Sequence, residues 1–205
     1  MFLKLEGRNC LVAGAGSVGE PKIASLIGAG ARVRVVSLQV TEQVKAWHRE
    51  GKILLERRAF EVSDLERTFL VIAATNSAET NQIVFREAQQ RGILCNAVDD
   101  PAHCDFFYPA VVRRGRLQIA ISTAGLSPAL AQRLRRELEL RFGEEYGDWL
   151  EELGTYRRQL FARDMEAEER RQLLHLAATR FPAIPTSRKR GEKWGTRRER
   201  MSKVR

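Results

Sequence analysis

The sequence predicts an α/β fold in which a doubly wound parallel sheet precedes a strand hairpin, a long helix and a helical C-terminal part. Three observations indicate this class. A glycine-rich turn follows the first apolar run, strand-like and helix-like segments then alternate, and this alternation stops after residue 108. The 205 residues suffice for one α/β domain and a smaller appendage.

The first strand ends in the pattern Gly14-x-Gly16-x-x-Gly19. In a Rossmann-type unit the first glycine permits the tight turn, the second admits a pyrophosphate, and the third lets the helix pack on the strand. The backbone at Ser17 and Val18 would then present N–H groups to the anion. The pattern also fits an ordinary strand-turn-helix, but a second strand at βαβ distance favours nucleotide binding.

The other elements of the sheet follow from apolar periodicity and from turn residues. A fully apolar run is typical of a central parallel strand, whereas alternating Arg and Val indicate a strand with a polar face near an edge. The expected strands are 9–13, 32–36, 53–56, 69–74 and 93–98, and the expected helices are 18–29, 41–50 and 79–90.

After residue 108 no helix separates the next two strand-like runs, so we expect a hairpin. Ser127 is a good N-cap and Pro128 fits the first position of the long helix that follows. The expected elements are strands 108–112 and 117–122, a turn at 113–116, and helices 127–142, 146–160 and 166–179.

The hairpin and the long helix are too small to form a core alone. An exposed two-stranded ribbon and an apolar helix stripe favour burial against a second subunit, so we expect a homodimer formed through residues 109–142. The expected domains are 1–108 for dinucleotide binding, 109–143 for dimerisation, 144–181 as a helical domain and 182–205 as a basic, disordered tail.

The net charge of +9 lies mostly at the C-terminus, because residues 180–205 hold ten Lys or Arg and two Glu. The rest is nearly neutral, which argues against nucleic acid as the main partner. We expect a solvated tail, with a non-specific polyanion contact as the alternative. No apolar run reaches membrane length and the N-terminus lacks signal-peptide features. Three scattered cysteines form no disulfide framework, so the sequence predicts a cytoplasmic protein.

The end of the second strand should carry the residue that binds the cofactor ribose, commonly Asp or Glu. This sequence has Ser37, Leu38 and Gln39 there. Ser37 or Gln39 can bond the ribose hydroxyls, and the choice between NAD and NADP stays open with a preference for NAD. Thr75 and Asn76 follow the 69–74 strand and are either ligand contacts or a helix cap.

Asp99 ends the last apolar strand at the same edge of the sheet. Asp100 precedes a proline and is the better turn residue, which makes Asp99 the candidate proton acceptor. His103, Cys104 and Asp105 follow without regular ligand spacing, so we expect no fixed metal site and an exposed His103.

Four motifs occur in the order Gly14–Lys22, Ala73–Asn76, Asn96–Pro101 and Ser122–Pro128. Together they closely resemble the precorrin-2 dehydrogenase family, the dehydrogenase and ferrochelatase module of siroheme synthase. The resemblance covers about residues 1–160. At Gly19-Glu20-Pro21 the sequence departs from the Ala-x-Arg frequent in the family, so no arginine role is carried over there.

The resemblance implies NAD-dependent oxidation of precorrin-2 to sirohydrochlorin, and in some members insertion of Fe(II) as a second substrate. It also implies that Asp99 is the pivotal carboxylate, which we expect to take the proton that accompanies hydride transfer. The substrate carries eight carboxylates. The loop with Ser122, Thr123 and Gly125, and the helix start at Ser127, either offer donors to them or form a helix cap alone.

A non-catalytic NAD(P)-sensing regulatory domain is the alternative function. Such domains share the glycine pattern, but they usually carry the acidic ribose residue that is missing at position 37. They also have no evident use for Asp99. Incubation with precorrin-2 and NAD distinguishes the two functions.

Overall fold

The computed structural model describes residues 2–179, and the chain divides into two compact units. The first unit holds the residues up to Tyr108 together with Ala124–Leu126, and the second holds Pro109–Thr123 and the chain from Ser127 onward. The expected tail at 182–205 lies outside the described residues.

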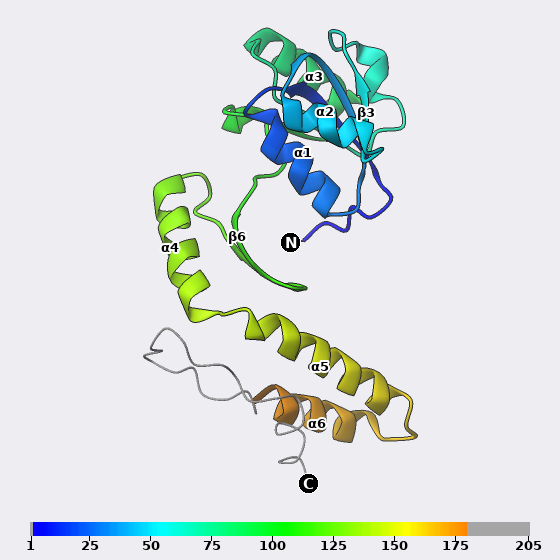
Figure 1. Cartoon of the computed structure of the whole chain (residues 1–205), viewed down its shortest axis with the longest axis vertical. Coiled ribbons are helices and arrows are strands. Elements are labelled where there is room, and N and C mark those ends of the chain that lie inside the picture. The colour runs from blue at the N-terminus through cyan, green and yellow to red at the C-terminus, as the bar shows by residue number, and fades with distance from the viewer. Residues whose placement is uncertain (1, 180–205) are drawn as a thin grey trace. The chain divides into compact units, whose positions relative to one another are not determined.

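The first unit contains a five-stranded parallel sheet, as the sequence predicts, with helices packed against it (Figure 1). The order of its strands is β3-β2-β1-β4-β5. Short 3₁₀ turns at Val62–Leu65 and Pro101–His103 were not expected. The strands are β1 (Asn9–Ala15), β2 (Arg32–Val40), β3 (Ile53–Glu56), β4 (Leu70–Ala73) and β5 (Leu94–Ala97), and the helices are α1 (Gly19–Gly28), α2 (Glu42–Arg49) and α3 (Ala78–Gln90).

Two apolar clusters form the core of this unit, one on each face of the sheet. Ile23 of α1 and Val44 of α2 belong to one cluster. Val84 and Ala88 of α3 belong to the other. Since both faces are covered, the central strands must be apolar at successive positions, which explains the continuous apolar runs in the sequence. Cys10 and Cys95 lie in these clusters as free buried thiols.

The polar face of β2 belongs to an ion-pair network around Asp64, whose side chain is only 2% exposed. Arg34 of β2 and Arg58 both contact this carboxylate, at 3.1 and 2.5 Å. Burial opposes its ionisation. The hydrogen bonds from Arg58 and from the N–H of Glu61 outweigh that effect and hold the pKa of Asp64 below its ordinary value. β2 lies second from the edge of the sheet.

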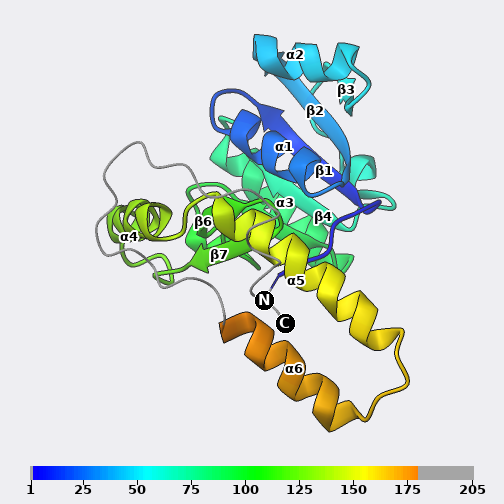
Figure 2. The ribbon, with the colours of Figure 1, turned by 60° about the horizontal axis from the view of Figure 1, so that its bottom comes forward.

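The second unit begins with an antiparallel hairpin and continues as helices, as expected (Figure 2). Arg114 donates to the carbonyls of Phe142 (2.7 Å) and Glu139 (2.9 Å), and so binds the hairpin to the end of the long helix. Its elements are β6 (Ala110–Arg114), β7 (Leu117–Ile121), α4 (Pro128–Arg141), α5 (Glu145–Phe161) and α6 (Ala167–Thr179). Among residues 2–179 no helix has the length and apolar character to cross a membrane.

Candidate functional site

The carboxyl ends of the parallel strands form the candidate site. Strand order reverses between β1 and β4, since β1 leads to β2 and β3 on one side and β4 and β5 continue on the other. Ligands of doubly wound sheets bind at such a switch point. The predicted cofactor residues lie at or after the ends of β1 and β4 or near the end of β2, and Asp99 follows β5.

The three glycines of the first turn have three different environments. Gly14 has φ +98°, and a Cβ there would lie 2.2 Å from the carbonyl oxygen of Ala74, so β1 and β4 approach each other through it. A Cβ on Gly19 would lie 2.3 Å from the carbonyl oxygen of Gly14. A Cβ on Gly16 would meet no atom within 4 Å. The first two positions are therefore filled by protein, and the third opens to the space a pyrophosphate needs.

The start of α1 presents backbone N–H groups without internal partners. Val18 is the N-cap residue and its side chain makes no capping bond. Among residues 2–179, the N–H groups of Ser17, Val18 and Gly19 donate to no acceptor, whereas Glu20 donates to Gly16 (3.0 Å). Free donors beside an open glycine fit the diphosphate of a dinucleotide.

Near its carboxyl end β2 bulges opposite Gly14. Ala13 pairs with Val36 and Ala15 pairs with Val40, which leaves residues 37–39 facing one residue of β1. The hydroxyl of Ser37 accepts from Ala15 (3.0 Å) and donates to the carbonyl of Gln39 (2.6 Å). Leu38 and Gln39 are exposed. The Ser37 proton is thus used inside the protein, whereas Gln39 is exposed, and a ribose contact by Gln39 stays a prediction.

At the end of β4, Thr75 is held by Asn81 of α3, a buried polar residue that sequence analysis missed. The Asn81 amide accepts from the Thr75 N–H (3.1 Å) and donates to the Thr75 carbonyl (3.1 Å), and the Thr75 hydroxyl donates to Asn81 Oδ1 (2.7 Å). Asn76 is exposed, and its side chain bonds no other described residue. Thr75 therefore shapes this strand end, and Asn76 remains the residue able to contact a ligand.

Asp99 occupies the left-handed backbone region, with φ +61°. Asp100 donates to the carbonyl of Ala97 (3.3 Å), which closes a tight turn around Asp99. The Asp99 side chain is exposed and accepts no hydrogen bond from residues 2–179. A non-glycine residue with positive φ is uncommon, and here it displays an unpaired carboxylate at the site.

The polar residues that follow Asp99 form hydrogen bonds within the protein. Asp100 contacts His103 Nδ1 at 2.6 Å, and the His103 ring packs edge-on against Phe85. The expectation of an exposed His103 is therefore wrong, because this packing partly buries the ring. Asp105 accepts from the N–H of Cys95 (2.8 Å). No group of three metal-ligating side chains forms among the residues that the structure describes.

A second missed residue, Asn96, holds the segment after Asp99 in place. Its side-chain amide donates to the carbonyl of Phe106 (2.8 Å) and contacts Cys104 Sγ (3.2 Å). Burial raises the pKa of the Cys104 thiol, which itself donates toward the Ala97 and Asp100 carbonyls. An asparagine inside an apolar strand was the sequence sign of this role.

The predicted substrate residues belong to the start of α4. Ser127 Oγ accepts from Leu130 (3.2 Å), and Thr123 Oγ1 accepts from the Ser127 N–H (3.2 Å) and donates to its carbonyl (3.1 Å). Gly125 has φ +80°. This is helix-cap geometry. A substrate contact by Ser122, Thr123, Gly125 or Ser127 stays a prediction.

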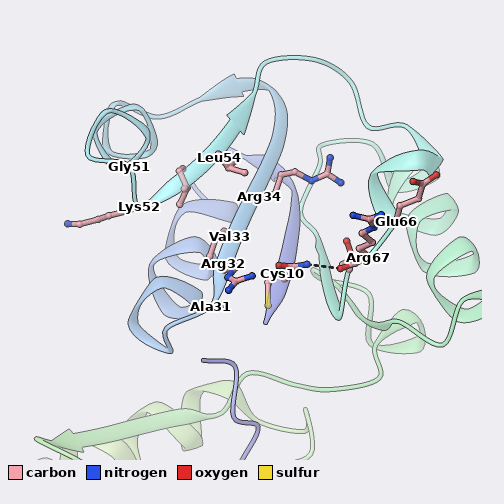
Figure 3. Close-up of a pocket in the computed structure, with 13 residues that line it drawn as sticks. Cys10, Ala31, Arg32, Val33, Arg34, Gly51, Lys52, Leu54, Glu66 and Arg67 are labelled. Atoms are coloured by element: carbon pink, nitrogen blue, oxygen red, sulfur yellow. Dashed lines mark hydrogen bonds between the residues drawn. The ribbon is translucent and has the colours of Figure 1, made fainter. Parts of the chain in front are cut away.

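A cavity of about 530 Å³ lies at the opposite edge of the sheet (Figure 3). It is lined by Asn9, Arg32 and Thr68, which start or precede β1, β2 and β4, and by Arg67 and Lys52. Asn9 Nδ2 donates to the Arg67 carbonyl there (3.0 Å). Since it opens at the amino ends of the strands, this cavity is separate from the glycine turn.

Comparison with known proteins matches both parts of the chain. A family model described as putative NAD(P)-binding matches residues 1–110, more than half of the chain, and one described as sirohaem biosynthesis protein central matches residues 114–140. The siroheme synthase of Nitrosococcus oceani is 39% identical over 147 residues, which is 72% of this chain and 31% of that protein. Siroheme synthase 1 of Yersinia enterocolitica is 41% identical over 157 residues, 77% of this chain and 33% of that protein.

The chain thus spans about a third of the length of these curated relatives. Among solved structures, the chain is similar to SirC, a precorrin-2 dehydrogenase, with a TM-score of 0.73 and 28% identity. That match covers 86% of this chain and 87% of the other. The similarity therefore extends beyond the dinucleotide-binding unit.

Proposed function

We propose that this chain, which belongs to the siroheme synthase and precorrin-2 dehydrogenase family, oxidises precorrin-2 to sirohydrochlorin with NAD as the hydride acceptor. One observation carries the proposal. An open glycine turn and an unpaired carboxylate, Asp99, follow strands of the same sheet at the same edge. A dehydrogenation needs both a hydride acceptor and a group that takes the accompanying proton.

The residues divide the reaction between them. A bound nicotinamide supplies the hydride acceptor. The N–H groups of Ser17, Val18 and Gly19 hold the pyrophosphate. The substrate loses one hydride and one proton, and the carboxylate of Asp99 takes the proton. Because the tight turn fixes the backbone of Asp99, this carboxylate is held at the strand end before the substrate arrives.

NAD is the proposed cofactor, in preference to NADP. Residues 37–39 near the end of β2 include no arginine or lysine that could pair with a 2′-phosphate. Gln39 offers a neutral side chain that can bond the ribose hydroxyls. A lower Kd for NAD than for NADP supports this assignment.

Two further parts of the proposal concern assembly and metal. The hairpin β6–β7 and α4 form the face through which we propose a homodimer, since Leu130 and Leu140 of α4 are exposed. Fe(II) is proposed as a second substrate, inserted into sirohydrochlorin with Asp99 accepting pyrrole protons. Light scattering at micromolar concentration tests the first part, and sirohydrochlorin absorbance after Fe(II) addition tests the second.

The central test is turnover by the wild-type chain and by Asp99→Ala. Wild type should convert precorrin-2 and NAD to sirohydrochlorin, and Asp99→Ala should bind NAD with unchanged Kd and form no product. Asp100→Asn is the matched control, because that carboxylate pairs with His103 and should be dispensable for turnover. An Asp99→Ala enzyme with wild-type turnover would remove Asp99 from the mechanism.

A further inference from the structure

Lys22 is a partly buried cation beside the candidate site without a bonded partner. It lies in the first turn of α1, and its ammonium stands 4.0 Å from the centre of the Tyr108 ring. Among residues 2–179 it donates no hydrogen bond and forms no ion pair. By contrast Lys45, on α2, pairs with Glu42 at 2.7 Å.

The ionisable groups that act on Lys22 lie in the segment that follows β5. Burial lowers the pKa of its ammonium, while the negative charge of Asp99, and of Cys104 when ionised, acts in the opposite direction. The Cys104 thiol and the Tyr108 hydroxyl both have pKa values raised by burial, so neither is an anion at neutral pH. Asp99 is therefore the anion facing Lys22, and it lies beyond ion-pair distance.

We propose that Lys22 is an anion-binding residue of this site and receives one carboxylate group of the substrate next to Asp99. The inference rests on the proposed function, because it takes the ligand to be the carboxylate-rich tetrapyrrole. The Lys22 ammonium has lost part of its water and has only the face of the Tyr108 ring in its place, so it favours an incoming carboxylate, which forms a charge-assisted hydrogen bond with it.

The position of Lys22 distinguishes a substrate carboxylate from the cofactor phosphates. The open N–H groups for the pyrophosphate lie at residues 17–19, where α1 begins. The Lys22 ammonium is instead held over Tyr108, within electrostatic reach of Asp99 after β5. An anion bound there would place the attached ring system beside the proton acceptor, which orients the substrate for reaction.

The test measures binding of sirohydrochlorin, the proposed product, by its fluorescence in the presence of NAD. Lys22→Met should raise the sirohydrochlorin Kd about tenfold or more, the loss expected for one hydrogen bond to a charged group. Lys22→Arg should recover most of that affinity because the charge remains. Lys45→Met is the matched control and should bind as wild type. The NAD Kd should be unchanged in all three variants.

Three results would overturn the assignment. Lys22→Met could bind sirohydrochlorin as tightly as wild type. It could lose NAD affinity with an unchanged sirohydrochlorin Kd, which would place the ammonium at the pyrophosphate. It could also shift only the acidic limb of the pH–rate profile, which would make Lys22 a positioning residue that acts through Asp99.

The same measurements separate this inference from the proposed function. A wild-type chain that binds sirohydrochlorin through Lys22 but does not oxidise precorrin-2 would refute the dehydrogenase and leave the anion site in place. Turnover that is insensitive to Lys22→Met, with an unchanged sirohydrochlorin Kd and substrate KM, would refute the anion site and leave the dehydrogenase.

Discussion

Asp64 and Asp99 are two carboxylates of one unit in opposite situations. Asp64 is buried, contacts two arginines and accepts a backbone N–H. Asp99 is exposed, accepts no hydrogen bond from the described residues and lies in the left-handed region. The difference indicates which polar groups maintain the fold and which are left for a ligand. Asp64 has its hydrogen-bonding capacity satisfied inside the protein, and Asp99 does not.

The largest expected effect comes from exchanging the two carboxylates for amides. Asp99→Asn should lower kcat about 10²- to 10⁴-fold, the range for a lost general base, with little change in the free energy of unfolding. Asp64→Asn should lower the free energy of unfolding by about 2–3 kcal/mol, because Arg34 and Arg58 lose their shared anion. Urea unfolding and turnover per folded molecule measure both effects. If each variant lost both turnover and stability, the contrast between a stabilising and a functional carboxylate would be wrong.

Two glycines of the first turn show the same contrast between a structural and a functional position. Gly14→Ala should lower the free energy of unfolding by more than about 2 kcal/mol, because its Cβ would meet the Ala74 backbone and its φ is +98°. Gly16→Ala should keep the wild-type Tm and weaken NAD binding about tenfold, since its Cβ points into open space. Thermal unfolding and NAD titration test the pair. A Gly16→Ala variant with wild-type NAD affinity would place the pyrophosphate elsewhere.

The smallest expected effect is on how the free energy of unfolding depends on pH in acid. The folded-state pKa of Asp64 lies below its unfolded value, so its contribution is complete above about pH 4 and is lost as pH falls through the folded pKa. Between about pH 4 and pH 2, the free energy of unfolding should therefore fall more steeply in wild type than in Asp64→Asn. Parallel slopes in urea titrations across this range would show that the network contributes nothing to acid stability.

Local sequence patterns were sufficient to predict the elements and the glycine turn that is proposed to bind the cofactor. The runs at 9–13 and 69–74, the glycine spacing and the cap at Ser127 all reflect neighbouring residues, and the structure contains each corresponding element. The Asp64 network was not predictable, because it joins β2, the end of β3 and a 3₁₀ turn through contacts distant in sequence.

In the candidate site, too, contacts between residues distant in sequence could not be predicted. Asp99 and the glycines could be placed by topology, but the residues that support the strand ends could not. Asn81 lies on the same face of α3 as Val84 and Ala88, and a polar residue within that apolar stripe was the available sign. Leu38 and Gln39 were expected beyond β2, whereas the bulge keeps them within the strand.

The segment that folds back on β5 has one more consequence. Asp105 donates its N–H to the carbonyl of Cys95 (2.8 Å), and its carboxylate receives the N–H of Cys95 in return (2.8 Å). The chain between them, which carries Asp99, is thus a short loop closed at its base. Much of the conformational entropy of this loop is lost on folding, so little remains to be lost when the substrate binds. The proposed proton acceptor, Asp99, is therefore preorganised by two hydrogen bonds in which it takes no part.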